Sequence, residues 1–365
     1  MRADPMRVLV VDDTVVYRKV ISEILAQLPG VEVVGVAANG RIALQKIDQL
    51  RPDLLTLDLE MPELDGLGVL RHLQQTRQPV GAIMLSAFTT AGADATIAAL
   101  KLGAFDFVLK PATGSMAESA EALRRDLQPK LEAFARSRLL RGALRTPPEP
   151  RAVPAPAPPP RPAMPGPVGR PLVVAIGIST GGPQALTTML PMLPGDLAAP
   201  VLIVQHMPPK FTRSLAEDLD SRCALKVREG QDGQRVSPGE VVIAPGGAQM
   251  RIERSENLPV TRITDDPPEN SCRPSVDYLF RSVAHEFGGQ AVGVIMTGMG
   301  SDGTLGCRLL KRRGATIITQ DEATCVVYGM PRAPAEEGLS DVIAPLDRIA
   351  PEIVRLAGKG APVCR

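Results

Sequence analysis

The stretch VLVVDDTVVYRKVISEILAQL at residues 8–28 decides the fold of the first part of the chain. Four consecutive apolar residues, Val8–Val11, predict a buried strand, and the periodic apolar residues that follow predict a helix over Val16–Leu28. Two acidic residues, Asp12 and Asp13, stand between the two elements. A buried strand that turns into a helix is the repeating unit of a parallel sheet.

The same alternation continues up to residue 110. The further strands that we expect are Val31–Ala37, Leu54–Leu57, Ala82–Leu85 and Phe105–Leu109. The further helices are Arg41–Leu50, Leu67–Gln75, Ala91–Leu102 and a closing helix at Glu118–Ala143. Five such repeats predict an α/β domain with a doubly wound parallel sheet, whose ligands bind at the carboxyl ends of the strands.

A proline-rich segment, TPPEPRAVPAPAPPPRPAMPGPVGRP at residues 146–171, separates this unit from the rest of the chain. Such a composition cannot form a packed core and predicts an extended tether. A docking site for a proline-binding partner is an alternative role for it. We therefore expect one domain at residues 1–145 and a second at residues 172–365.

The second domain again alternates apolar runs and amphipathic stretches. The expected strands are Leu172–Ile178, Val201–Gln205, Val241–Ala244, Ala291–Met296 and Ala315–Thr319. The expected helices are Pro183–Leu190, Phe211–Ser221, Val276–Phe287 and Thr304–Arg313. The pattern predicts a second doubly wound α/β domain, with a small hairpin around Val241–Ile263.

The bulk composition excludes several classes of protein. The 365 residues carry 41 Lys and Arg against 40 Asp and Glu, a net charge of +1, which argues against nucleic acid as the main partner. No apolar run approaches the roughly 18–20 residues that span a bilayer. The five cysteines show no C-x-x-C spacing; they are Cys223, Cys272, Cys307, Cys325 and Cys364. We expect a cytoplasmic protein that does not insert into membranes.

The first candidate site consists of polar residues at the ends of the predicted strands. Asp12 and Asp13 follow the first strand, and Asp58 follows the third. Three carboxylates at one sheet edge repel one another unless a cation such as Mg²⁺ neutralises them. Ser86 and Lys110 end the fourth and fifth strands, so a hydroxyl and an ammonium would adjoin the carboxylates. This combination suits a receptor for a transferred phosphoryl group, whereas any one Asp alone favours a helix N-cap.

These residues resemble the receiver domains of two-component response regulators, which have a flavodoxin-like fold. The resemblance covers residues 6–130 and rests on VVDD at 10–13, DLEMPELDG at 58–66, Ser86-Ala87 and Lys110-Pro111. It implies that a sensor histidine kinase phosphorylates Asp58. It also implies that Asp13, Asp58 and the Glu60 carbonyl hold Mg²⁺, with Asp12 assisting. Phe107 matches a switching aromatic residue of many receivers, and simple core packing is the alternative.

The second candidate site begins with Ser179, which stands in GISTG at residues 177–181. This G-x-S-x-G pattern is typical of a strand-to-helix turn that exposes a nucleophile, although small residues favour many tight turns. The chain has three histidines from which a base can come. His72 lies in the first domain, and His285 points off the apolar stripe of its predicted helix. His206 ends a predicted strand at the same sheet edge as Ser179, so we expect it to be the base, with a simple turn residue as the alternative.

Asp302 is the expected acid that orients the histidine. It stands in TGMGSDG at residues 297–303, where three glycines let the backbone approach a ligand. A buried carboxylate on an imidazole fixes its tautomer and stabilises the cation that forms when the serine loses its proton. The same side chain can cap the helix at Thr304–Arg313, and the two roles are compatible.

Residues 172–345 resemble the catalytic domain of the chemoreceptor protein-glutamate methylesterases of the CheB family. The matching motifs are GISTGGP at 177–183, QHMP at 205–208, APGG at 244–247, RPSVD at 273–277, TGMGSDG at 297–303 and CVVYGMP at 325–331. The resemblance implies a serine hydrolase that needs no cofactor, acts on chemoreceptors and uses Ser179, His206 and Asp302 as its triad. Thr180 and the backbone amide of Met299 match the oxyanion and site-support positions.

Three other functions compete with this interpretation. A DNA-binding response regulator would carry a basic helix-turn-helix after the linker, and none is visible. A non-catalytic adaptor would not need the Ser179, His206 and Asp302 set. A general esterase for small molecules would share the triad and differ only in its substrates.

Overall fold

The computed structural model describes residues 4–111, 115–145, 172–255 and 258–358. Internal contacts divide the chain into two compact units, Met1–Ala135 and Arg136–Arg365. The proline-rich segment at 146–171 lies outside the described residues, so the extended tether and the domain boundaries at 145 and 172 stay predictions.

The first unit is built on a five-stranded parallel sheet with the order β2-β1-β3-β4-β5. Its strands are β1 (Met6–Val11), β2 (Val31–Ala37), β3 (Leu54–Asp58), β4 (Gly81–Ser86) and β5 (Asp106–Leu109). All five strands were predicted from the apolar runs. The central strand β3 is buried along its whole length, as expected of a strand covered by helices on both faces.

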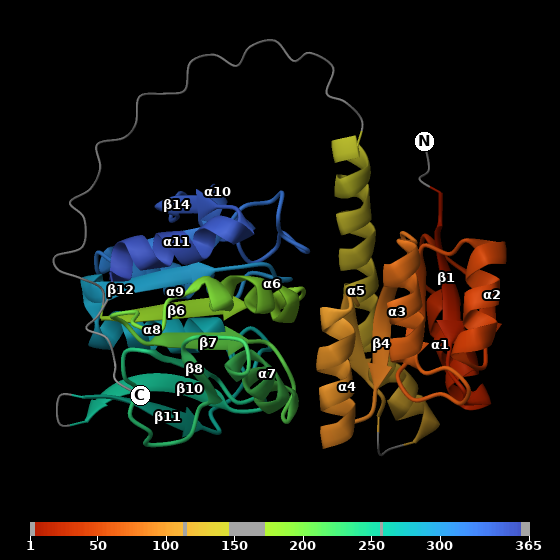
Figure 1. Ribbon diagram of the computed structural model, residues 1–365, viewed down its shortest axis with the longest axis horizontal. Helices are drawn as coiled ribbons and strands as arrows, with labels where there is room; N and C mark the ends of the chain where they lie inside the picture. The colour runs from red at the N-terminus through yellow and green to blue at the C-terminus, as the bar shows by residue number, and fades with distance from the viewer. Residues whose placement is uncertain (1–3, 112–114, 146–171, 256–257, 359–365) are drawn as a thin grey trace, which may run out of the picture. The chain divides into compact units, whose positions relative to one another are not determined.

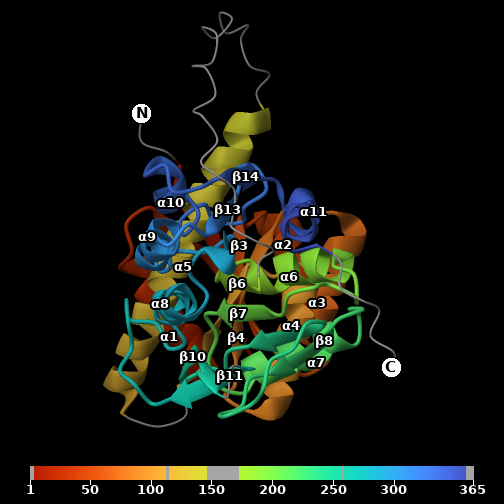
Figure 2. The same ribbon diagram turned by 90° about the vertical axis from the view of Figure 1, so that its left-hand side faces the viewer.

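Five helices cover this sheet, with α2, α3 and α4 on one face and α1 and α5 on the other (Figure 2). They are α1 (Val15–Ala26), α2 (Gly40–Leu50), α3 (Gly66–Thr76), α4 (Thr90–Lys101) and α5 (Met116–Arg145). Four begin at a capping side chain that accepts a hydrogen bond from the first turn: Asn39 for α2, Asp65 for α3, Thr89 for α4 and Ser115 for α5. These caps fix where each helix leaves the functional edge of the sheet.

The second unit contains a seven-stranded parallel sheet with the order β14-β13-β12-β6-β7-β9-β8. Its strands are β6 (Val173–Ile178), β7 (Val201–Gln205), β8 (Lys226–Glu229), β9 (Glu240–Ile243), β12 (Ala291–Ile295), β13 (Thr316–Gln320) and β14 (Val342–Ala344). Both edge strands, β8 and β14, were missed from the sequence. They are three or four residues long and partly exposed, so they lack the apolar run that marks a buried strand.

A separate antiparallel hairpin joins β10 (Gln249–Ser255) to β11 (Leu258–Thr264) and packs against α8. The hairpin predicted around Val241–Ile263 is present, but its first strand begins at Gln249, later than the predicted start. Val241 belongs to β9, which pairs in parallel with β7 and β8 in the main sheet. A short apolar run alone does not distinguish these two kinds of strand.

Helices α8 and α9 lie on one face of the main sheet, and α6, α7 and α11 lie on the other (Figures 1 and 2). The helices of this unit are α6 (Gly182–Met189), α7 (Phe211–Asp220), α8 (Val276–Glu286), α9 (Thr304–Arg312), α10 (Arg332–Glu336) and α11 (Leu346–Ala357), with short 3₁₀ helices at Leu190–Met192 and Gly288–Gln290. Helices α10 and α11 were not predicted. None of the helices in the described ranges has the length and apolar character needed to cross a membrane.

Candidate functional site

Ser179 lies at the carboxyl end of β6, one residue before the turn into α6. Its backbone N–H donates to the Thr297 carbonyl at 3.0 Å, and its carbonyl accepts from the Gly182 N–H at 2.7 Å. Gly181 has a φ of 78°, a left-handed conformation that glycine adopts without strain, and forms the start of α6. The sharp strand-to-helix turn predicted from G-x-S-x-G is thus present.

His206 follows the neighbouring strand β7 and lies beside Ser179 in the sheet. Strands β6 and β7 pair in parallel with Ile178 opposite Gln205, and the His206 N–H donates to the Ile178 carbonyl at 3.1 Å. Adjacent strands are about 4.8 Å apart, so the two candidate catalytic residues have neighbouring backbones. Within the described residues the Ser179 hydroxyl forms no hydrogen bond to the imidazole. Such bonds are often long in a resting enzyme and shorten when substrate binds.

Asp302 is hydrogen-bonded to the Nε2 side of the His206 ring, with its Oδ2 2.8 Å from Nε2. The carboxylate is 3% exposed and accepts hydrogen bonds from four further groups. These donors are the Asn270 amide at 2.9 Å, the Ser275 hydroxyl at 2.9 Å, and the backbone N–H groups of Val276 at 2.7 Å and Asp277 at 3.2 Å. Asp302 is therefore fully hydrogen-bonded and oriented toward the imidazole.

The suggested second role of Asp302, as a cap of the helix that follows it, was wrong. Helix α9 begins after Gly303 without a side-chain cap. The Asp302 carboxylate instead accepts from N–H groups in the first turn of α8, where the positive end of a helix dipole stabilises a negative charge. The sequence suggested that Asp302 caps α9, which follows it directly. In the fold, the Asp302 carboxylate lies instead at the N-terminus of α8.

The environment separates the pKa values of the two partners. Burial alone would raise the pKa of Asp302, but the hydrogen bond and charge of His206 and the donors at Val276 and Asn270 lower it to about 2. Burial alone would lower the pKa of His206, but its hydrogen bonds to Asp302 and Cys272 and their charges raise it to about 9. The pair therefore favours an imidazolium beside a carboxylate at neutral pH.

The loop after β12 approaches Ser179 closely. A Cβ at Gly298 would lie 2.8 Å from the Cβ of Ser179 and would overlap the sulfur of Met330, so only glycine fits there. The next residue, Met299, has a backbone N–H without a hydrogen-bond partner in the described residues, and its side chain is 38% exposed. Thr180 is buried, and its carbonyl accepts from the Thr297 hydroxyl at 3.0 Å. Both residues predicted to support the site thus adjoin the nucleophile, and their oxyanion roles stay predictions.

The predicted phosphoacceptor residues also converge in the first unit. Lys110 Nζ lies 2.7 Å from Asp12 Oδ2 and 2.6 Å from Asp58 Oδ2. Asp12 and Asp58 are almost fully buried, and Asp13 is exposed. Burial raises the pKa of Asp58 to about 6, against the lowering effect of Lys110. A partly neutralised acidic cluster therefore lies at the carboxyl ends of β1 and β3.

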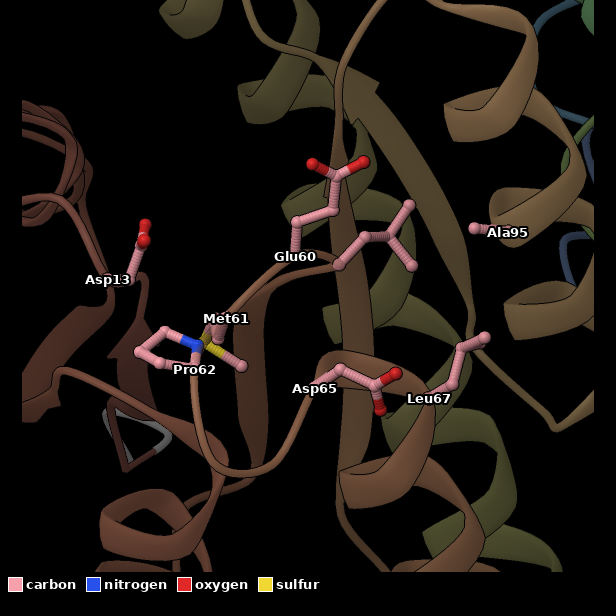
Figure 3. A pocket seen from close by; sticks show the side chains of 8 residues that line it. Asp13, Glu60, Met61, Pro62, Asp65, Leu67 and Ala95 are labelled. Atoms are coloured by element: carbon pink, nitrogen blue, oxygen red, sulfur yellow. The ribbon is translucent and has the colours of Figure 1, made fainter.

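One member of this cluster, Asp13 from the end of β1, lines a surface hollow (Figure 3). Glu60, from the loop after β3, lines it as well. The carboxylates of Asp12, Asp13 and Asp58 have oxygens within 4.8 Å of one another, and one lysine compensates only part of their charge. Oxygen ligands with excess negative charge fit Mg²⁺. The Glu60 carbonyl as a further ligand stays a prediction.

Two residues of the predicted receiver switch are held away from this hollow. Ser86 is at the end of β4 as predicted, but its hydroxyl donates to the Gly92 carbonyl at 3.2 Å and accepts from the Thr96 hydroxyl at 2.8 Å. Phe107 is buried, with Lys130 Nζ 5.7 Å from its ring centre. Core packing therefore accounts for the position of Phe107, and its switching role stays a prediction.

Comparisons with known proteins match both parts of the chain. A family model described as CheB methylesterase matches residues 174–353, and one described as response regulator receiver domain matches residues 8–121. A protein-glutamate methylesterase/protein-glutamine glutaminase from Desulfotalea psychrophila is 50% identical over 358 residues, which cover 96% of this chain and 98% of the relative. The chain belongs to the CheB methylesterase family.

Other members of the CheB methylesterase family extend this match. A relative with the same name from Archaeoglobus fulgidus is 42% identical, with 96% of this chain and 97% of the relative covered. The crystal structure of the Thermotoga maritima CheB methylesterase catalytic domain matches with a TM-score of 0.50 and 40% identity, over 52% of this chain and 100% of that one. The resemblances to receivers and to this family that the motifs indicated are confirmed.

Two neighbours of the candidate residues His206 and Asp302 were missed from the sequence. Cys272 Sγ lies 3.8 Å from His206 Nδ1, the ring nitrogen that faces away from Asp302. Two residues earlier, Asn270 donates to Asp302. The available signal was their position just before RPSVD at 273–277, a family motif with no evident chemistry of its own. The fold shows that this segment forms the wall around the imidazole and its carboxylate.

Proposed function

We propose that this chain removes methyl esters from glutamate side chains of chemoreceptors, with release of methanol, and that phosphorylation of Asp58 regulates this activity. We include deamidation of receptor glutamines as a second reaction, because the same attack on an amide carbonyl releases ammonia. One observation carries the proposal: an imidazole held by a buried carboxylate lies beside Ser179, in a chain that is 50% identical over nearly its full length to an enzyme of that name.

The reaction follows from which nitrogen of His206 is engaged. Because Nε2 faces Asp302, Nδ1 is the atom that takes the proton of Ser179 as the hydroxyl attacks the ester carbonyl. The oxyanion forms near the Met299 amide and Thr180, and each such donor is worth about 3 kcal/mol in the barrier. Methanol leaves with the proton from His206. Water, activated by the same nitrogen, then releases the glutamate carboxylate and restores Ser179.

The receiver residues supply a separate reaction. The Asp58 carboxylate attacks the phosphorus of a sensor histidine kinase's phosphohistidine, and Lys110 stabilises the charge of the phosphoryl oxygens. Asp13, Asp58 and the Glu60 carbonyl would hold Mg²⁺, with Asp12 assisting. The cation would neutralise the carboxylates and the incoming phosphoryl group. The kinase and the receptor segments both act in the cytoplasm, where we place this protein.

Methanol release from methylated receptor membranes tests the esterase assignment. Ser179→Ala removes the nucleophile and His206→Ala removes the base, and we expect each to lower the rate by about 10⁵–10⁶-fold. His285→Ala is the matched control, because the side chain of this histidine is 78% exposed on α8 and, among the described residues, its ring is hydrogen-bonded only to Glu286. A rate close to that of the unmodified protein in either test variant would remove that residue from the mechanism.

A further inference from the structure

The two ring nitrogens of His206 face different chemical groups. Nε2 is hydrogen-bonded to Asp302, and Nδ1 faces the sulfur of Cys272 at 3.8 Å. We refer to Cys272 and the Nδ1 side of His206 as the thiol–imidazole pair. Neither the proposed ester hydrolysis nor the phosphorylation of Asp58 uses the thiol.

A carboxylate, an imidazole and a thiol in this order match a zinc-binding arrangement. Zinc prefers thiolate and imidazole ligands, at about 2.3 Å from sulfur and about 2.0 Å from nitrogen. At a tetrahedral angle these lengths place sulfur and nitrogen about 3.5 Å apart. The observed 3.8 Å differs from this by a few tenths of an ångström, which a side-chain rotation covers.

The contact between Asp302 and Nε2 completes the same pattern. A histidine that binds zinc through one nitrogen usually donates its other N–H to a carboxylate, which fixes the ring and raises its basicity. Asp302 already does so, and its five donors hold it in place. The ligand atoms of His206, Cys272 and Asp302 lie within 4.8 Å of one another. We propose that the thiol–imidazole pair binds a thiophilic divalent metal ion of the zinc class through Cys272 Sγ and His206 Nδ1.

The other described cysteines do not offer such a site. Burial raises the pKa of the Cys223 thiol to about 11 and that of Cys307 and Cys325 further still, which disfavours the thiolate that a metal requires. The described histidines other than His206 are His72 and His285, and neither lies in a cluster of metal-ligating side chains. Binding at Cys272 releases its thiol proton to solvent, and water completes the coordination. With two protein ligands the site binds more weakly than a structural zinc site.

Metal binding at the thiol–imidazole pair should inhibit methyl ester hydrolysis, an expectation that rests on the proposed function. The metal takes the Nδ1 lone pair, which is the base for Ser179. General-base catalysis contributes about 10²–10⁴-fold, so saturating Zn²⁺ lowers methanol release by about 100-fold or more, and a chelator restores it. Metal binding itself depends only on the geometry of the thiol–imidazole pair.

Titration of the metal-free full-length protein with Co²⁺ tests the site directly. We expect a near-ultraviolet thiolate-to-cobalt charge-transfer band in the unmodified protein, its loss in Cys272→Ser, and its retention in Cys223→Ser. Cys223 lies beyond the end of α7, which runs back from the carboxyl edge of the sheet, so it is a thiol distant from His206. No band in the unmodified protein, or a band that persists in Cys272→Ser, would overturn the inference.

Inhibition by Zn²⁺ is then measured on the same proteins, each relative to its own metal-free rate. We expect Cys272→Ser to need at least about tenfold more Zn²⁺ for half inhibition, and Cys223→Ser to behave like the unmodified protein. If the cobalt band depends on Cys272 but Zn²⁺ leaves methanol release unchanged, the metal site is supported. The role of Nδ1 as the base for Ser179 is then contradicted. If the band is absent while Ser179→Ala and His206→Ala abolish hydrolysis, the metal site is contradicted and the proposed function is still supported.

Discussion

Asp58, the last residue of β3, and Asp302, in the loop after β12, are both almost fully buried carboxylates, yet their surroundings are opposite. In the described residues, the Asp58 carboxylate pairs only with Lys110, at 2.6 Å; burial and the nearby Asp12 and Asp13 raise its pKa to about 6. Asp302 has five donors, and its pKa is lowered to about 2. A carboxylate that is short of donors keeps free lone pairs for an incoming group. A saturated carboxylate is fixed and can only orient its neighbour.

Of the two carboxylates, Asp302 should have the larger effect on hydrolysis, because it orients His206. Asp302→Asn keeps the shape but presents an amide to Nε2, which reverses the preferred tautomer, so methanol release should fall by about 10⁴-fold. Asp277→Asn is the control, because Asp277 is buried beside Asp302 and accepts from the Gly306 N–H without contacting His206. Equal losses in both variants would mean that folding, and not the tautomer, is affected.

A second test asks whether the hydrolase site depends on close approach of backbone. Gly298→Ala places a methyl group 2.8 Å from the Ser179 Cβ, and a displacement of the nucleophile by about 1 Å costs on the order of 100-fold in rate. Gly300→Ala serves as the control. It lies in the same loop with a φ of 85° and no atom within 4 Å of an added Cβ, so it strains the backbone without crowding Ser179. A kcat of Gly298→Ala above that of Gly300→Ala would contradict this account.

The pH profile tests the electrostatic part of the comparison. His206 acts as a base only when neutral, and its pKa is about 9. The rate should therefore rise about tenfold per pH unit through neutrality and level off near pH 9. Cys272→Ala removes one of the groups that raise this pKa, so the rising limb should move to lower pH and the rate at pH 7 should increase. An unmoved limb would show that the thiol does not influence the base.

The reactive role of Asp58 predicts a smaller effect. A small phosphodonor such as acetyl phosphate should raise methanol release of the unmodified protein by about tenfold, which needs only about 1.4 kcal/mol between the two states. Asp58→Asn should abolish this rise, because its amide cannot accept the phosphoryl group. The control is Asp53→Asn, at an aspartate that accepts from the Arg7 N–H before β3 begins. Activation that survives in Asp58→Asn would place the phosphorylation elsewhere.

The smallest effect concerns a single donor to Asp302. Ser275→Ala removes one of the five donors and the N-cap of α8, with an expected stability loss of about 1 kcal/mol and a rate loss of a few fold. Thr89→Ala removes the analogous cap of α4 in the receiver and should lower stability without changing the metal-free rate. Urea unfolding and methanol release measure both variants. An unchanged rate in Ser275→Ala would mean that four donors suffice.

The predictable part of the fold consists of its buried strands. Runs such as Val8–Val11 and Val201–Gln205 are apolar because helices cover both faces of a parallel sheet, so they stand out in the sequence. The edge strand β8 and the helices α10 and α11 were not predicted. Strand β8 and helix α10 are short, so tertiary contacts and not periodicity decide their structure. Helix α11 does carry apolar residues at helical spacing, with Ile349, Ala350, Ile353 and Ala357 buried, so its signal was present in the sequence and was overlooked.

The residues of the candidate sites also fall into two groups, those that the sequence predicted and those that it did not. Ser179, His206, Asp58 and Lys110 could be found because each ends a strand, and strand ends of parallel sheets converge. Cys272 and Asn270 could not, because they lie in the irregular segment after β11, whose path is set by contacts far apart in sequence. The orientation of Ser86 toward Thr96 was equally hidden, since spacing fixes the backbone position of a residue and not the direction of its side chain.

Labelling with a fluorophosphonate tests most directly whether Ser179 and His206 form one reactive unit held by Asp302. We predict one label per chain, on the peptide that contains Ser179, and slowing of this reaction by several orders of magnitude in His206→Ala and Asp302→Asn. Labelling at another serine, or equally rapid labelling of Ser179 in His206→Ala, would contradict the assignment.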